Sequence, residues 1–118
     1  MESRDTGQIL ASFAARRNWG VHHLPRSVLL ALVREVGEAA ELLQWVPDNQ
    51  VSHWLDSDDN RDRFAGELAD VSIYLHYLAQ STGVDLDEAV AHKIRVNEQR
   101  FPEETGSIDV PGDRTTSP

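Results

Sequence analysis

Apolar residues recur at helical spacing in four stretches of the chain, and turn-forming residues separate these stretches. The first stretch, which contains Leu10 and Phe13, predicts a helix over about residues 6–17. A capping-box pattern begins at Asp5, whose carboxylate is therefore the expected N-cap of this helix. A short loop that carries one tryptophan and two histidines follows the helix.

The second stretch is the most apolar part of the chain, and from Ser27 to Trp45 it reads SVLLALVREVGEAAELLQW. Pro25 suits the first turn of a helix and Pro47 stops one, so we expect a helix over about residues 25–45. Its composition is typical of a helix that is buried nearly all round. It is apolar on more faces than three neighbouring helices can cover, which predicts self-association.

A polar loop follows, in which Trp54 belongs to a single predicted helical turn. The third helix is expected over about residues 60–81, with Asp58 or Asp59 as its N-cap. Gly83 follows this stretch and is the expected left-handed residue at the C-terminus of the helix.

The fourth stretch begins with a second capping box at Asp85 and predicts a helix over about residues 86–100, which Pro102 stops. Residues 103–118 lack periodicity and are rich in Pro, Gly, Ser and Thr. We therefore expect one domain over residues 1–102, followed by a mobile tail or an arm that orders on a partner subunit.

No segment shows the alternation and hairpin turns of a β-sheet, so the sequence predicts an all-α fold. Four main helices favour a four-helix bundle built from two antiparallel helical hairpins. Charges interrupt every apolar run before it reaches the roughly 18–20 residues of a membrane span. The polar N-terminus does not resemble a signal peptide, so we expect a soluble cytoplasmic protein.

The composition narrows the classes of partner. Of 118 residues, 40% are hydrophobic, which suffices for one modest core, and the formal net charge is −9. An acidic surface disfavours nucleic-acid backbones and anionic membranes, but it allows nucleotides, whose phosphates can be held through bound cations. The chain has no cysteine, so disulfides and thiolate metal sites are excluded.

Carboxylates lie at helical spacing inside two of the apolar stretches. Glu35, Glu38 and Glu41 form one acidic stripe on the second helix, and Glu67 and Asp70 form an acid pair on the third. Such residues can be solvated helix faces, but apolar neighbours surround both groups, and crowded carboxylates repel unless a cation lies between them. The sequence therefore favours a metal site, and the all-oxygen ligands favour Mg²⁺ or Mn²⁺ over zinc.

A ferritin-like di-iron site is the competing use of acidic residues in a helical bundle, and it requires Glu-x-x-His on two helices. Neither acid pair closes on a histidine, and His76 lies too far beyond Asp70 to fit, so di-iron is disfavoured. Tyr74 shares a face with Asp70 and is explained equally well by core packing or by a pocket. Polar residues from Lys93 to Arg100 share a face that is either solvated or donates to anionic oxygens.

Three ordered blocks resemble the MazG-like all-α nucleoside triphosphate pyrophosphatases, and specifically their dCTP pyrophosphatase branch. These blocks are RNW…HLPRSVLLALVREVGEAAELLQW, ELADVSIYLHYLA and VDLDEAVAHKIRVNEQRFP, within about residues 8–102. The family pattern has E-x-x-E on one helix and E-x-x-D on the next, and it is matched by Glu35/Glu38 and Glu67/Asp70.

The end of the match and one departure refine this resemblance. The family's Lys-x-x-x-Asn-x-x-Arg-aromatic-Pro ending is matched over residues 93–102. MazG itself carries a further Glu at the position of Arg34, and the dCTP pyrophosphatase branch also lacks that acid. The departure therefore favours the branch over MazG itself.

The resemblance implies an enzyme that hydrolyses a (deoxy)nucleoside triphosphate, dCTP or a related pyrimidine dNTP, to the monophosphate and pyrophosphate. It also implies homodimers or homotetramers with sites near subunit interfaces. It assigns Mg²⁺, or Mn²⁺, to four acids, of which Glu38 would also orient the attacking water: Glu35, Glu38, Glu67 and Asp70. It assigns the base and sugar to Trp19, His23, Trp45 and Tyr74, and the phosphates to Lys93, Asn97 and Arg100.

One further class of function fits the same residues. A non-catalytic nucleotide- or partner-binding helical module could keep the fold and the acidic surface without the chemistry. Retention of all four acids argues against this alternative, because a binding module has no need of a complete metal site. The preferred base is not evident from the sequence, because an aromatic slot stacks any base and specificity requires hydrogen bonds to the base edge.

Overall fold

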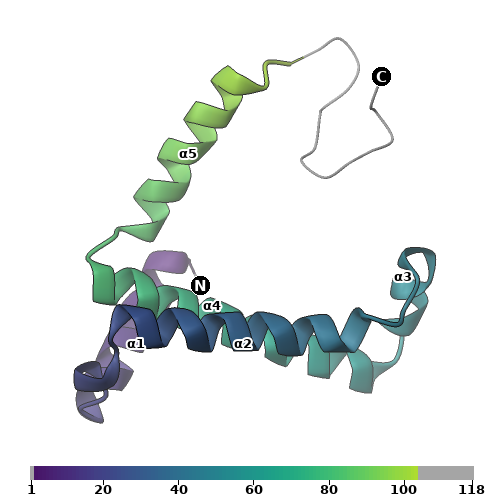
Figure 1. The fold of residues 1–118 in the computed structure, drawn as a ribbon, viewed down its shortest axis with the longest axis horizontal. Coiled ribbons are helices and arrows are strands. Elements are labelled where there is room, and N and C mark those ends of the chain that lie inside the picture. Colours follow the sequence, from purple (N-terminus) through teal and green to yellow (C-terminus); the bar gives the residue numbers. More distant parts are fainter. Residues whose placement is uncertain (1, 104–118) are drawn as a thin grey trace. The chain divides into compact units, whose positions relative to one another are not determined.

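The computed structural model describes residues 2–103, and all regular structure in this range is helical (Figure 1). The predicted all-α class is thereby confirmed for these residues. Short 3₁₀ turns lie at Gly20–His22 and Asp48–Gln50. The α-helices are α1 (Ser3–Arg16), α2 (Pro25–Leu43), α3 (Val51–Trp54), α4 (Asp58–Thr82) and α5 (Leu86–Arg100).

The chain divides into two compact units, of which the first spans residues 1–85 and the second begins at Leu86. Within the described part, α5 is the only helix of the second unit. The four-helix bundle and the single domain over residues 1–102 therefore stay predictions. The predicted tail falls, from residue 104 onward, outside the described residues. Within residues 2–103, no helix is long and apolar enough to cross a membrane.

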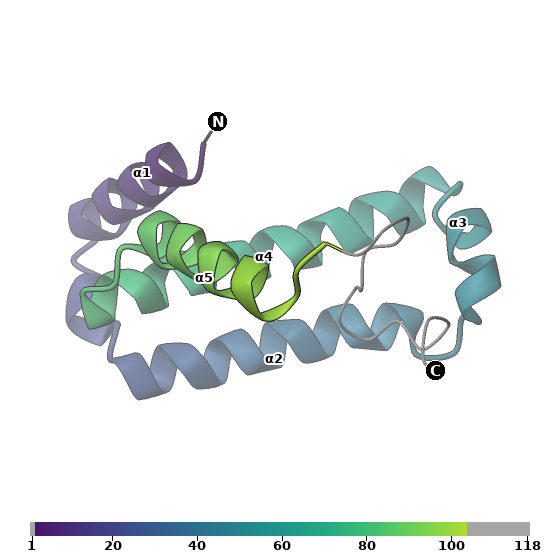
Figure 2. The ribbon, with the colours of Figure 1, turned by 90° about the horizontal axis from the view of Figure 1, so that it is seen from above.

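The first unit is organised around α2 and α4, which run side by side in opposite directions, while α1 packs on α4 (Figure 2). The face of α2 that meets α4 carries Val28 and Glu35, both buried and two turns apart. On α4, the buried residues cluster in the last three turns, where His76, Tyr77 and Ala79 lie. The half of the α2–α4 pair near α1 therefore holds the core.

This core is small. Ala14, Val28 and Tyr77 form its centre, and partly buried apolar side chains surround them: Leu10, Ile73, Tyr74 and Leu78. No large side chain in the described residues falls below 2% exposure. Many apolar residues on the other side of α2 are instead half exposed, among them Leu29 and Val33.

Hydrogen bonds fix α1 on α4 next to this core. The carbonyl oxygen of Ser72 accepts from Nδ1 of His76 at 2.8 Å, so Nε2 is left to pair with Ser3 Oγ at 3.0 Å. The Gln80 side chain donates to the Gly7 carbonyl at 2.7 Å. These contacts hold the two helices in a fixed register along their length.

Helix N-termini differ from two sequence predictions. The first helix starts earlier than expected, at Ser3 with Glu2 as N-cap, so Asp5 lies inside the first turn. The α4 helix has Ser57 as its N-cap, in place of the predicted Asp58 or Asp59. The Ser57 hydroxyl accepts a hydrogen bond from the Asn60 N–H at 3.3 Å. Acids in a first turn are favourable wherever the cap lies, because the helix dipole attracts them. An acidic run therefore marks a helix start without identifying its cap.

Both left-handed residues of the described chain lie just beyond helix C-termini. Asn18 has φ of 54° and Gly83 has φ of 71°. After each, the next residue donates its N–H back into the helix, Trp19 to the Ala14 carbonyl and Val84 to the Ala79 carbonyl, both at 2.9 Å. These are Schellman-type ends. The prediction for Gly83 is confirmed.

Candidate metal and substrate site

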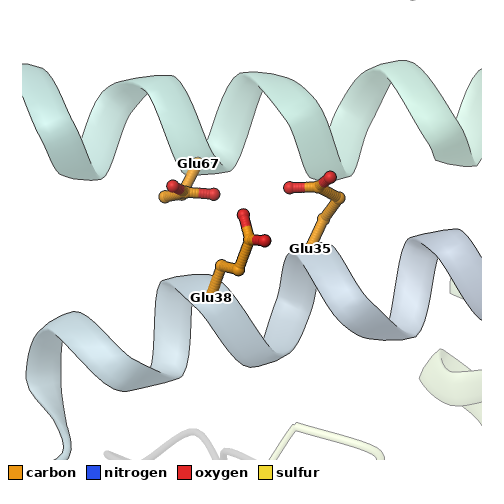
Figure 3. A group of neighbouring side chains, drawn as sticks. All are labelled: Glu35, Glu38 and Glu67. Atoms are coloured by element: carbon orange, nitrogen blue, oxygen red, sulfur yellow. The ribbon is translucent and has the colours of Figure 1, made fainter.

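Three carboxylates meet between α2 and α4, as Figure 3 shows. Glu35 and Glu38 project from α2, Glu67 projects from α4, and one oxygen of each lies within 4.8 Å of the others. The i, i+3 spacing places the first two on one helix face, and the antiparallel packing brings the third to it. We call these residues the carboxylate cluster.

The carboxylate cluster is electrostatically unfavourable without a cation. Glu35 is only 7% exposed, and burial is the main reason that its pKa is raised above the ordinary value. The hydrogen bond and charge of Glu38 raise the pKa of Glu35 further, and so does the charge of Asp70. Nearby Arg34, whose Nη2 lies 3.5 Å from Glu35 Oε1, opposes this rise without reversing it.

Two oxygens of the carboxylate cluster have unmet bonding capacity. Oε2 of Glu35 and Oε2 of Glu67 are buried and accept no hydrogen bond from any of residues 2–103. A buried carboxylate oxygen without a donor is costly, and a divalent cation is the ligand that resolves this cost for several oxygens at once. The donor set contains oxygen alone, which fits Mg²⁺ or Mn²⁺.

Two other acids named from the sequence lie differently. Asp70 is exposed and outside the carboxylate cluster, yet it is close enough for its charge to act on Glu35. Glu41 is also exposed and does not join the cluster. Of the acidic stripe predicted on α2, the structure thus brings two members to Glu67, and the metal role of Asp70 stays a prediction.

The end of α1 positions Trp19. Its Schellman-type bond to Ala14 turns the chain back, and the indole packs edge-to-face on Phe13 with ring centroids 5.5 Å apart. The guanidinium of Arg17 lies over the ring of Phe13, with its central carbon 3.5 Å from the ring centroid. Trp19 keeps 43% of its surface exposed, so one part of its ring is available to a ligand.

His23 and Tyr77 border a small cavity between α1 and α4. Their rings are in contact, tilted by 36° with centroids 4.2 Å apart, and the cavity has a volume of about 230 Å³. Ala11, Ala14 and Gly20 leave this space open because they have little or no side chain. Burial raises the pKa of Tyr77, so its hydroxyl stays protonated and able to donate. The volume is below the roughly 300–1,000 Å³ of most ligand sites.

Tyr77 was not singled out by the sequence. A signal existed, because Asp70, Tyr74 and Tyr77 follow i, i+4, i+7 spacing and share one face of α4. Tyr74 itself packs against the core, which fits the simpler of its two sequence interpretations.

Trp45 lies far from the other predicted base-binding residues of the same chain. It follows the C-terminus of α2 and is 86% exposed, whereas Trp19 and His23 precede the N-terminus of that helix. With 19 residues, α2 is about 28 Å long. One chain therefore does not bring these three side chains around one base.

Three predicted phosphate-binding residues lie on α5, in the second unit. Lys93 and Arg100 are exposed there, and Asn97 is half-buried. They share one face of the helix, as their i, i+4, i+7 spacing requires. Their role toward phosphate stays a prediction.

The MazG-like family matches residues 32–108, a range that includes every member of the carboxylate cluster. The chain belongs to the MazG-like family. This membership confirms the family resemblance stated from the sequence.

Among MazG-like relatives, the dCTP pyrophosphatase 1 proteins of Bos taurus and Homo sapiens are each 46% identical to this chain over 98 residues. The matched region covers 83% of this chain and 58% of each relative, so the chain spans less than two thirds of their length. A crystal structure of a pyrophosphatase from Archaeoglobus fulgidus superposes with a TM-score of 0.76 at 29% identity, over 85% of this chain and 92% of that one. These relatives support the dCTP pyrophosphatase branch.

Proposed function

We propose that this chain is a nucleoside triphosphate pyrophosphatase that converts dCTP or a related pyrimidine dNTP to the monophosphate and pyrophosphate. The carboxylate cluster is the observation that supports this most directly, because three acids converge with two buried oxygens lacking donors. The 46% identity to relatives named dCTP pyrophosphatase 1 supports the substrate class.

The residues that would hold Mg²⁺, or Mn²⁺ as the alternative ion, are Glu35, Glu38, Glu67 and Asp70. When bound, the cation neutralises charge on the triphosphate and lowers the pKa of a water molecule at the site. Burial between two helices fixes Glu35 before substrate arrives, so the reorganisation of this carboxylate during the reaction is small. Glu38 is half-buried beside Glu35 and orients the attacking water.

The reaction breaks one phosphoanhydride bond. The water oxygen attacks the α-phosphorus and loses a proton to the solvent, the bond from this phosphorus to its bridging oxygen breaks, and pyrophosphate leaves with the bond's electron pair. Lys93, Asn97 and Arg100 donate hydrogen bonds to the phosphate oxygens, and their cationic members offset the charge of the leaving group. This arrangement serves nucleotide-pool housekeeping.

The base and sugar bind against Trp19, His23 and Tyr74 of one chain, together with Trp45 of a second copy. Aromatic faces stack any base, so a preference for cytosine requires hydrogen bonds to the base edge. The chain acts as a homodimer or homotetramer, which the half-exposed apolar side of α2 supports.

The decisive test is a turnover panel. Each dNTP and NTP is incubated with the protein, with and without Mg²⁺, and the products are identified. Monophosphate plus pyrophosphate is expected only with Mg²⁺. Glu38→Ala should lower kcat by about a hundredfold or more, whereas Asp62→Ala, an exposed acid on α4, should retain turnover. Diphosphate plus phosphate would contradict the proposed bond cleavage, and nucleotide binding without turnover would favour the non-catalytic module.

A further inference from the structure

Arg34 borders the carboxylate cluster, and the proposed reaction gives this residue no role. It lies on α2 directly before Glu35 and one turn before Glu38. Its Nη2 is 3.5 Å from Oε1 of Glu35. Burial is the main cause that raises the pKa of Glu35, and the charge of Arg34 is the cause that lowers it. Arg34 therefore partly offsets the negative charge of the carboxylate cluster.

The contact between Arg34 and Glu35 is loose and incomplete. At 3.5 Å it is longer than the roughly 2.7–2.9 Å of a strong hydrogen bond between a cationic N–H and a carboxylate. The Arg34 side chain is 65% exposed, whereas that of Glu35 is 9% exposed. The guanidinium contacts only Oε1, and Oε2 of Glu35 accepts no hydrogen bond from any of residues 2–103. A solvated guanidinium on a flexible side chain leaves such a contact at little cost.

A divalent cation at the carboxylate cluster would compete with Arg34 for Glu35. One oxygen of each cluster member lies within 4.8 Å of the others, which is close enough for one ion to contact all three. Mg²⁺ binds oxygen at about 2.0–2.1 Å, so an ion on Oε1 would lie within about 6 Å of the guanidinium in its present position. Like charges repel at this distance. Arg34 and the ion therefore oppose each other at Glu35.

A phosphate group bound to the same ion would lie within reach of Arg34. Two oxygens that share one Mg²⁺ ion are about 3–4 Å apart, because each is about 2.1 Å from the metal. The guanidinium is already at a similar distance from Oε1 of Glu35. A small movement of the side chain would thus transfer it from the carboxylate to the phosphate, and its planar fork of N–H donors suits phosphate oxygens.

We propose that Arg34 is a displaceable counter-ion, which pairs with Glu35 in the absence of metal, leaves it when the cation binds, and then donates hydrogen bonds to the phosphates of the metal-bound triphosphate. The last part rests on the proposed function, whereas the first two parts concern the chain and the cation alone. Arg34 thereby weakens the binding of free Mg²⁺ and strengthens the binding of the Mg²⁺–triphosphate complex. The site then favours an ion that arrives with a nucleotide over the free ion.

The competition at Glu35 is tested with Mg²⁺ alone, by isothermal titration calorimetry. In Arg34→Gln, the dissociation constant for Mg²⁺ should fall about three- to tenfold, because a neighbouring like charge is removed. Arg26→Gln is the matched control, because it makes the same change of charge on α2 about 12 Å further along the helix. Its dissociation constant should stay near that of the wild type. An unchanged or raised constant in Arg34→Gln, or an equal fall in the control, would overturn the competition.

The pairing in the absence of metal is tested by a double-mutant cycle in EDTA. Arg34→Gln should lower the Tm of the wild type more than that of Glu35→Gln, because an uncharged side chain at position 35 leaves no charge to offset. Equal changes of Tm in the two backgrounds would overturn the pairing.

The transfer to phosphate is tested with inorganic triphosphate at saturating Mg²⁺, a probe that has no base or sugar. Arg34→Gln should weaken its binding about tenfold, as expected for the loss of a charge-assisted hydrogen bond. Arg34→Lys should recover part of this loss, because it keeps the charge without the fork of donors. A general structural defect would weaken the binding of both the free ion and the complex, so opposite effects distinguish the proposed role. Equal affinity of wild type and Arg34→Gln for the complex would overturn the transfer.

Steady-state kinetics connect this role to the proposed function. With dCTP at saturating Mg²⁺, Arg34→Gln should raise KM about tenfold and change kcat little, because the lost contact binds substrate and transition state alike. Arg26→Gln should keep both constants. A fall in kcat with an unchanged KM would overturn the binding role. A wild type without turnover would instead reject the proposed function, while the measurements with Mg²⁺ and inorganic triphosphate still decide the role of Arg34.

Discussion

The carboxylate cluster contains one residue, Glu35, whose ionised form is unfavourable in the folded chain. Glu35 is buried beside Glu38, and its raised pKa shows that the folded chain disfavours its ionised form. Arg34 contacts the same carboxylate from the exposed side of α2, so it reduces the cost without occupying the cluster. Glu35 is thus a buried carboxylate whose ionised form a bound cation would stabilise.

At the same scale, Tyr77 gives a testable pH dependence. Burial raises its pKa above the ordinary value of 10.0, so the folded state binds its proton more tightly than the unfolded state. The stabilisation this provides is complete below pH 10 and is lost as the pH rises through the raised pKa. We expect the free energy of unfolding of the wild type, measured in urea, to fall above pH 10 relative to Tyr77→Phe. A difference between the two proteins that is constant with pH would contradict this.

At the scale of elements, helix ends decide where aromatic residues lie. The left-handed Asn18 turns the chain so that Trp19 packs back on Phe13. The same kind of end at Gly83 closes α4. Each end satisfies carbonyls that the helix would otherwise leave without partners.

Substitution of two glycines separates backbone strain from helix propensity. Gly83→Ala should destabilise the fold by about 1 kcal/mol, because φ is 71° and nothing else lies near the added methyl group. Gly66→Ala, inside α4 with equally open space, should stabilise it by about 0.5–1 kcal/mol. Urea denaturation measures the free energy of unfolding of both variants. A change of the same sign in the two variants would reject this explanation.

Element ends show which part of the fold the sequence could predict. Pro25 and Gly83 fixed helix ends correctly, because each residue allows only a few backbone conformations. The caps at Asp5 and Asp58 were wrong, because acids are favourable anywhere in a first turn. The position of a helix end is therefore predictable from a residue that allows few backbone conformations, and is not predictable from an acid that is favourable at several positions.

At the scale of the whole molecule, the site depends on how helices pair. Helical spacing placed Glu35 and Glu38 together, since both lie on α2. Their meeting with Glu67 depends on the register of α2 against α4, which periodicity does not contain. The separation of Trp45 from His23, by contrast, could be predicted, because the helix expected over about residues 25–45 lies between them.

Cation binding should stabilise the whole fold. At a Mg²⁺ concentration one hundred times the dissociation constant, linkage predicts about 2.7 kcal/mol, seen as a rise in Tm. Glu35→Gln should remove most of this response, whereas Asp62→Asn, an exposed acid outside the cluster, should keep it. Differential scanning fluorimetry with EDTA as the reference measures it. A response equal in both variants would mean that the ion binds elsewhere.

The sparse interior of the first unit has a consequence for the cell. A core centred on Ala14, Val28 and Tyr77 leaves little stability to a solitary chain. If α2 is covered only when copies meet, folding and assembly become one equilibrium, and dilution unfolds the protein. The abundance of the chain then determines how much of it resists proteases, so halving expression removes more than half of the folded protein.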